Sequence, residues 1–93
     1  MVLNTTFTDV QPQAGERVPR MMSYAQAAVL AVQREMEADA AVHVIGEDVG
    51  RGGIFGQYAG LQQRFGPQRV IDTPISEANI MGAGVGMALA GLR

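Results

Sequence analysis

The sequence predicts an α/β fold built on a parallel sheet, and two observations support this prediction. Segments with helical periodicity alternate with two short β-branched runs, in the order helix, strand, helix, strand, helix. Hydrophobic residues make up 47% of the 93 residues and charged residues 17%, which is typical of a globular domain. Two strands are too few for a stable sheet, and the last residues, "AGLR", fall where a third strand is due. We therefore expect the front part of a larger domain.

The chain divides into two parts of different composition. Residues 1–20 are polar and lack periodicity, so we expect a flexible N-terminal tail. Residues 21–93 should form one partial domain that is truncated at its C-terminus. Met21 and Met22 lie where the compact part begins, so either is an alternative start to Met1.

The first helix and the first strand follow this boundary. Ser23 and Gln26 have the spacing of a capping box, which predicts a helix over residues 24–37. The run "AVHVIG" at 41–46 predicts a short buried strand. His43 lies in this strand, and we interpret it as a core residue whose ring is hydrogen-bonded.

A second helix is predicted over residues 54–65, where four apolar side chains share one helical face: Ile54, Tyr58, Leu61 and Phe65. Gly66 and Pro67 should end this helix.

The second strand and the last helix complete the pattern. The run "RVID" predicts a strand over residues 69–72, and "TPI" predicts a turn. Ser76 should cap a last helix that reaches about Ala90.

Composition excludes several classes of function. The net charge of −2 offers no basic field for nucleic acid or an anionic membrane. The absence of cysteine excludes disulfides, thiolate catalysis and cysteine-bound metals, and His43 has no second histidine or cysteine with which to build a metal site. A serine–histidine–aspartate triad is not indicated, because the sequence contains no nucleophile motif. Residues 78–92 form the longest uncharged stretch, shorter than the ~20 residues of a membrane span. Without a signal-peptide pattern in residues 1–20, we expect a soluble cytoplasmic protein.

Acidic residues follow both predicted strands. Glu47 and Asp48 come after the first strand, and Glu77 comes soon after the second. Ligands bind at the carboxyl ends of parallel strands, so both loops should open on one functional edge of the sheet.

Glu77 has two interpretations. One is a carboxylate at a helix start, which the helix dipole favours by ~0.3–1 kcal/mol. The other is a site carboxylate, because a helix that is apolar all round is normally buried and would bury its first turn with it. A buried carboxylate needs a partner, and such groups hold or share protons in catalysis.

Small residues form a stripe in the last helix. Gly82, Gly86 and Ala90 are four residues apart on one face, although each helical glycine costs ~1 kcal/mol relative to alanine. Their clustering indicates a close backbone approach, either within the domain or at a subunit interface. The run "GAGVG" lies inside the helix, which argues against a dinucleotide fingerprint, and "GRGG" at 50–53 favours a mobile turn over a phosphate cradle.

Three motifs resemble one family. "GEDVG", "GLQQRFGPQRVIDTPISE" and "GAGVGMALAGLR" are similar to the β subunits of the thiamine-diphosphate-dependent 2-oxo acid dehydrogenases, which act on pyruvate, branched-chain 2-oxo acids or acetoin. The similarity runs from about Met22 to Arg93. It implies the N-terminal part of a transketolase-like, pyrimidine-binding domain with a parallel sheet, and it leaves the substrate open.

The resemblance also implies roles for single residues. Glu77 would hydrogen-bond a ring nitrogen of the cofactor's aminopyrimidine, which promotes loss of the thiazolium proton and attack on the 2-oxo acid. Ile75 would touch the pyrimidine. Glu47 would lie near the same ring and belong to a proton relay.

The resemblance implies partners as well. A separate α subunit would hold the diphosphate and its Mg²⁺ in an α2β2 tetramer, with the small-residue helix at a subunit contact. The acyl group would pass to a lipoyl acyltransferase component. Family chains are several times longer, so we expect the isolated chain to lack decarboxylase activity. The alternatives are a non-catalytic subunit-interaction module and another transketolase-like enzyme with both cofactor halves on one chain.

Overall fold

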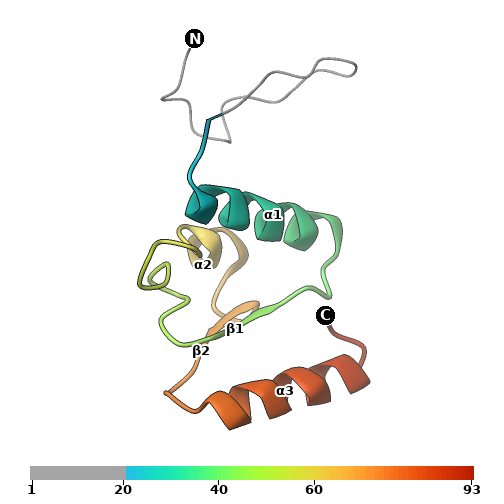
Figure 1. Ribbon diagram of the computed structural model, residues 1–93. Helices are drawn as coiled ribbons and strands as arrows, with labels where there is room; N and C mark the ends of the chain where they lie inside the picture. The colour runs from blue at the N-terminus through green and yellow to red at the C-terminus, as the bar shows by residue number, and fades with distance from the viewer. Residues whose placement is uncertain (1–20) are drawn as a thin grey trace.

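The computed structural model describes residues 21–93, and the predicted tail at 1–20 lies outside them. The elements are α1 (Tyr24–Ala38), β1 (Val44–Gly46), α2 (Leu61–Phe65), β2 (Val70–Asp72) and α3 (Glu77–Leu89). The two strands pair in parallel. Figure 1 shows α1 and α2 on one side of the sheet and α3 on the other. The α/β prediction and the order of its elements are therefore confirmed.

The start of α1 follows from its capping box. The Ser23 hydroxyl accepts the backbone N–H of Gln26 at 3.2 Å, and the Gln26 side chain accepts the N–H of Ser23 at 2.9 Å. These bonds satisfy donors that have no partner inside the helix. The helix then buries Val29 and Met36, which pack in one cluster with Val70 of β2.

The predicted helix at 54–65 is wrong in its first half. Only residues 61–65 are helical, and residues 54–60 form turns. Gly56 has φ 72° and Gly60 has φ 80°, conformations that interrupt a right-handed helix and that glycine adopts readily. Ile54 is 74% exposed, so its spacing from Tyr58 and Leu61 does not reflect a shared buried face.

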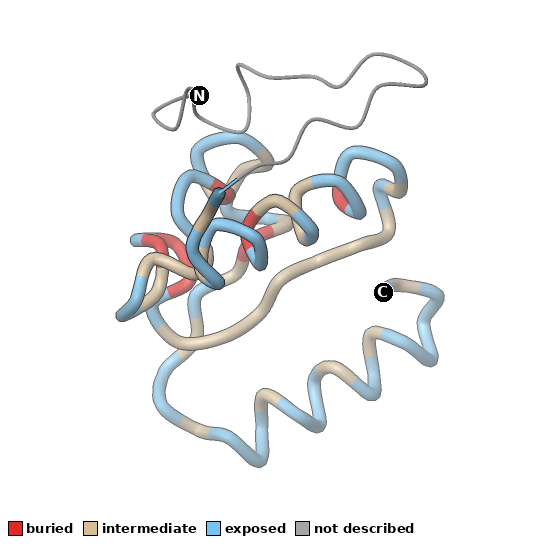
Figure 2. The backbone as a smooth tube through the Cα atoms, turned by 45° about the horizontal axis from the view of Figure 1, so that its top comes forward, coloured by how far each residue is buried: buried red, intermediate tan, exposed pale blue. Residues whose placement is uncertain are grey.

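The hydrophobic core lies on one side of the sheet. Figure 2 shows the buried residues gathered between α1, α2 and the strands. Five side chains form its centre: Val29, Met36, Val49, Leu61 and Val70. By contrast, α3 has no buried residue, and Leu89 is 86% exposed. The expectation that an all-apolar helix would be buried is therefore wrong for the described part of the chain.

The edge of β1 that faces away from β2 carries a further pairing. The N–H of Arg93 donates to the carbonyl of Ala41 at 2.8 Å, and the carbonyl of Arg93 accepts the N–H of His43 at 2.6 Å. This pair of bonds has the pattern of a parallel ladder. Arg93 therefore pairs with Val42, just before β1, at the place where the sequence indicated a third strand. The Nδ1 of His43 lies 2.8 Å from the Ala41 carbonyl, so its ring has a hydrogen-bond partner as predicted. The prediction of a core histidine in a buried strand is wrong, because His43 and all of β1 are only half-buried.

Arg69 ties three segments together through its guanidinium group. Its Nη2 donates to the carbonyls of Met36 at 2.9 Å, Asp39 at 3.0 Å and Val42 at 2.9 Å. The same group lies 5.1 Å from the ring centroid of Phe65. Carbonyls at a helix end lack partners within the helix, and a cation there is favoured by the helix dipole. Arg69 therefore caps α1 and fastens the approach to β1.

We expect Arg69→Ala to lower the free energy of unfolding by ~2–4 kcal/mol, because it leaves several part-buried carbonyls without a donor. Arg69→Lys should recover little of this loss, since one ammonium cannot reproduce the planar guanidinium fork. Urea unfolding monitored by circular dichroism measures the effect. The control is Arg64→Ala, which breaks an exposed pair with Glu37 and should cost less than ~1 kcal/mol. Equal losses in Arg69→Ala and Arg64→Ala would contradict this role.

Asp39 should make the stability depend on pH. The N–H of Ala41, 2.8 Å from its carboxylate, lowers the pKa of Asp39; burial opposes this shift, and the pairing with Arg93 adds to it. A depressed folded pKa gives stability that is present above the unfolded pKa and is lost as pH falls through the folded value. Unfolding midpoints measured from pH 6 to pH 2 should therefore converge for the parent chain and Asp39→Asn at the acid end. A constant difference would contradict this assignment.

Candidate functional site

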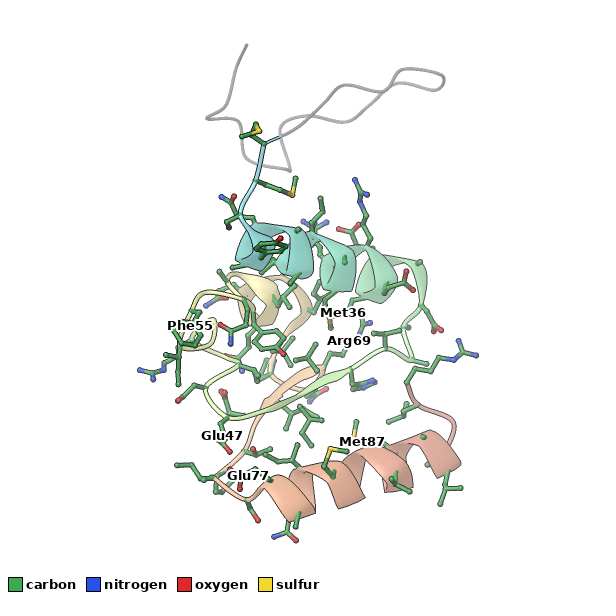
Figure 3. The ribbon with its side chains drawn as sticks, viewed as in Figure 1. Met36, Glu47, Phe55, Arg69, Glu77 and Met87 are labelled. Carbon is green, nitrogen blue, oxygen red and sulfur yellow. The ribbon has the colours of Figure 1, made fainter. Side chains whose placement is uncertain are left out.

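The carboxyl ends of β1 and β2 are level. Gly46 pairs with Asp72, and the N–H of Thr73 donates to the Gly46 carbonyl at 2.9 Å. The turn that starts at Glu47 and the turn that leads to Glu77 therefore leave the same edge of the sheet, as the sequence predicted. Figure 3 shows both glutamates at this edge.

The turn after β1 is anchored to the end of β2. Its Val49 side chain enters the core, and the N–H of Gly50 donates to Asp72 Oδ1 at 2.7 Å. Gln62 of α2 donates to Asp72 Oδ2 at 3.3 Å and to the Val70 carbonyl at 2.9 Å. The segment that was predicted as a mobile turn is thus held at its first residue.

The sequence analysis did not predict this anchor, although a glycine at position 50 is compatible with a close approach of another group to the backbone. A Cβ on Gly50 would lie 2.2 Å from Asp72 Oδ2 and 2.7 Å from the Gln62 amide. The glycine therefore permits a close approach of backbone and carboxylate. The partners are 22 residues apart in sequence, a separation that no local pattern could connect.

The turn before α3 differs from the predicted cap. Ser76 occupies the N-cap position, but its side chain accepts no backbone N–H. Its Oγ instead accepts the Asn79 side chain at 2.7 Å. The Ser76 hydroxyl is thus engaged by a side chain of the same helix in place of a backbone N–H, and the predicted cap is absent.

Glu77 is the first residue of α3 and is exposed. Ile75, two residues earlier, is 79% exposed. The expectation that the apolar helix would bury this carboxylate is therefore wrong for the described chain. Among the described helices and strands, α3 contacts β1 alone, and nothing in residues 21–93 covers its first turn. Its position is that of a helix-start carboxylate, which the dipole favours.

A small cavity lies between this edge and α3. It has a volume of about 320 Å³ and is lined by residues of β1, the turn and α3: Ile45, Thr73, Pro74, Ser76, Asn79, Ile80 and Ala83. Thr73 Oγ1 is buried there without a hydrogen-bond partner. The wall is mainly apolar, and Glu47, Ile75 and Glu77 lie outside it.

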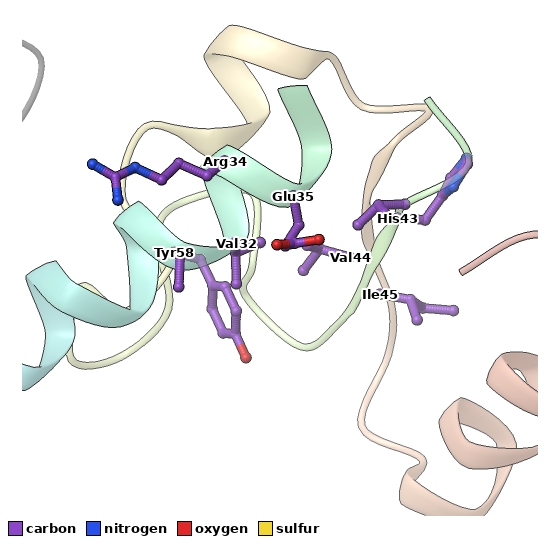
Figure 4. Close-up of a pocket in the computed structure, with 9 residues that line it drawn as sticks. Val32, Arg34, Glu35, His43, Val44, Ile45 and Tyr58 are labelled. Atoms are coloured by element: carbon purple, nitrogen blue, oxygen red, sulfur yellow. The ribbon is translucent and has the colours of Figure 1, made fainter. Parts of the chain in front are cut away.

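A larger hollow of about 740 Å³ lies on the other face of the sheet, between α1 and β1. Figure 4 shows Val32, Val44 and Tyr58 lining it together with Arg34 and Glu35. Neither Glu47 nor Glu77 is among the residues that line it.

Residues 21–93 contain no group of three or more histidine, aspartate or glutamate side chains placed to hold a metal ion.

No helix within this range combines the length and the apolar character that crossing a membrane requires.

The small-residue stripe lies on an uncovered surface. A Cβ on Gly82 or Gly86 would meet no neighbouring heavy atom within 4 Å, apart from the helix's own backbone. Ala90 is exposed as well. These residues therefore do not serve a close contact within the described chain, and the subunit-interface interpretation stays a prediction.

The family of the chain follows from comparison with known proteins. Residues 20–93 match the family model described as transketolase, pyrimidine binding domain. The chain therefore belongs to this family.

The chain is similar to β subunits of 2-oxoisovalerate and pyruvate dehydrogenases. The chain is 53% identical to the 2-oxoisovalerate dehydrogenase subunit beta of Bacillus subtilis (strain 168) over 78% of this chain and 23% of the relative. It is 50% identical to the pyruvate dehydrogenase E1 component subunit beta of Acholeplasma laidlawii, over 68% of this chain and 20% of the relative. Identity to the mitochondrial pyruvate dehydrogenase E1 component subunit beta-1 of Arabidopsis thaliana is 41% over 96% of this chain. The chain spans 20–25% of the length of these curated relatives.

We expect Gly82→Ala and Gly86→Ala each to stabilise the isolated chain by ~0.5–1 kcal/mol, because alanine favours the helix and its Cβ meets nothing here. Urea unfolding measures the change. Gly50→Ala is the matched control and should destabilise the chain, since its Cβ would collide with Asp72. Destabilisation by Gly82→Ala would show that another backbone covers the stripe.

Proposed function

We propose that the chain supplies the pyrimidine-binding half of a thiamine diphosphate site in a 2-oxo acid dehydrogenase. The observation that carries this proposal is the shared edge: the Glu47 turn and the Ile75–Glu77 segment leave adjacent parallel strands at one level. Membership of the pyrimidine-binding family supports it. The complete reaction belongs to a longer assembly, because the relatives are about four times as long as the matched region.

The residues present fit the aminopyrimidine part of the cofactor. Ile75 offers an exposed apolar surface for a flat ring, and Glu77 offers a carboxylate two residues further on. Glu77 would form a hydrogen bond with a ring nitrogen and share a proton with it, and Glu47 would lie beside the same ring as a proton-relay group. Covering these residues would exclude water, and a hydrogen bond to a carboxylate is stronger in such a setting.

When bound, thiamine diphosphate supplies the nucleophilic carbon and the electron sink that decarboxylation of a 2-oxo acid requires. Within this proposal, the chain would orient the pyrimidine through Ile75, and the Glu77 carboxyl group would share a proton with a ring nitrogen. A carboxyl group held in place in this way would contribute to catalysis through its position beside the ring and through proton transfer.

The remaining parts of the site are assigned to partners. An α subunit would hold the diphosphate and Mg²⁺, in an α2β2 assembly whose contact includes α3. The acyl product would pass to a lipoyl acyltransferase component. The names of the relatives include both 2-oxoisovalerate and pyruvate dehydrogenases, so the proposed substrate is a 2-oxo acid as a class. A cytoplasmic location stays a prediction, since the name of the Arabidopsis relative includes the word mitochondrial.

A non-catalytic interaction module is the second candidate. The observation that favours it is the exposed apolar face of α3, formed by Met81, Val85 and Leu89. Contiguous apolar surface of this kind marks interaction sites. Both candidates predict subunit contact, but only the first requires the carboxylate of Glu77.

We expect Glu77→Gln, placed in the complete β subunit and assembled with its α partner, to lower 2-oxo acid turnover by roughly 100-fold or more. The amide keeps the size of the side chain but cannot take up or release the proton that the carboxyl group would share with the ring. Subunit assembly, measured by gel filtration, should be unchanged. The 93-residue chain alone should show no turnover.

Glu37→Gln provides the matched control, because Glu37 is an exposed glutamate on α1, away from the strand ends. Its effect on turnover should be less than ~2-fold. Full activity of the Glu77→Gln enzyme would remove the catalytic proposal and leave the interaction module. Turnover by the isolated chain would show that the site is complete without a partner.

A further inference from the structure

The carboxylate of Asp72 uses both oxygens to join two segments at the site edge. Oδ1 accepts the N–H of Gly50 at 2.7 Å, and Oδ2 accepts the Gln62 amide at 3.3 Å. The same Gln62 nitrogen donates to the carbonyl of Val70 at 2.9 Å, inside β2. Asp72 therefore connects the turn after β1 with α2 and with its own strand.

We propose that Asp72 is a positioning residue, which fixes the turn that carries Glu47 against the carboxyl end of β2. This inference rests on the proposed function, because it gives Glu47 a role beside the bound ring. Asp72 is not itself offered as a catalytic group, since both of its oxygens are already engaged by protein donors. It acts through the backbone of Gly50, three residues after Glu47.

The shape of the turn explains why such an anchor is needed. Asp48 adopts φ 55°, a left-handed conformation that costs a non-glycine residue roughly 1–2 kcal/mol. Val49 holds the turn from the core side, and the Gly50–Asp72 bond holds it from the sheet edge. Glu47 directly precedes this strained residue, so its place at the edge depends on both attachments.

The close fit at Gly50 supports a dedicated contact. The position has no room for a side chain, because a Cβ would lie 2.2 Å from Asp72 Oδ2. Hydrogen bonds from backbone N–H groups to carboxylates are short and are stronger than neutral ones. An aspartate at the last residue of β2 has the reach for this bond, whereas a glutamate there would displace the carboxylate by one methylene.

The first test is amide hydrogen exchange of the 93-residue chain, followed by NMR. Asp72→Ala should speed the exchange of the Gly50 amide by about tenfold or more, because the bond to a charged acceptor is lost. Asp72→Asn keeps a neutral acceptor and should speed it by a smaller factor, which also provides a result if the alanine variant does not fold. Asp48→Asn removes the same charge without touching Gly50 and should change its exchange by less than about twofold.

The second test is a double-mutant cycle in the complete β subunit with its α partner. Asp72→Asn should lower kcat by about tenfold, with little change in the KM for the 2-oxo acid. In the Glu47→Gln background the same substitution should lower kcat by less than about twofold, because the group that it positions has already been replaced. A merely structural loss would have equal effects in the two backgrounds.

Each outcome decides a separate step. Unchanged Gly50 exchange in both Asp72 variants would overturn the anchor. Faster exchange combined with an additive cycle would overturn the positioning role. Failure of the proposed function would appear differently, as an unsubstituted complex that neither binds thiamine diphosphate nor turns over a 2-oxo acid, and the exchange result would stand independently of it.

Discussion

The contact of Arg69 with β1 is the interaction on which the rest of the structure depends. Its main-chain carbonyl accepts the N–H of Val44 at 2.9 Å, while its side chain donates to the Val42 carbonyl two residues earlier. The same guanidinium caps the end of α1. One residue thus fixes the register of the two strands and the distance of α1 from them. Because that register pairs Gly46 with Asp72, it also brings the two acidic turns to one level.

The two faces of the sheet are stabilised unequally. One face carries α1, α2 and all five buried core residues, whereas α3 covers the other without burying a side chain. Two strands alone form a marginal sheet, and apolar area is what stabilises small domains. The side chains of Met81, Val85 and Leu89 on α3 are exposed in the described chain. Burying this apolar surface against another surface would therefore add stability.

Local signals in the sequence predicted local structure well. The capping box located the start of α1, and the β-branched runs located both strands, because these features act within a few residues. The predicted helix over 54–65 failed where Gly56 and Gly60 adopt left-handed conformations, since apolar spacing carries no information about φ. The site was predictable at the level of its edge, from strand order. The Asp72–Gly50 bond was not, because it joins residues brought together only by tertiary structure.

The exposure of the Glu77 carboxylate and of the α3 surface have one physical explanation. A carboxylate at a helix start is stable in water and is favoured by the dipole, so it needs no cover in order to fold. The same carboxylate gains strength as a hydrogen-bond acceptor only when water is excluded. Residues 21–93 therefore fold with the site open, and they leave the apolar side chains of Ile75 and α3 available on the surface. A partner that packs against this surface would bury the apolar side chains and exclude water from the Glu77 carboxylate at the same time. In the proposed assembly, the contact that buries α3 would therefore also cover the Glu77 carboxylate.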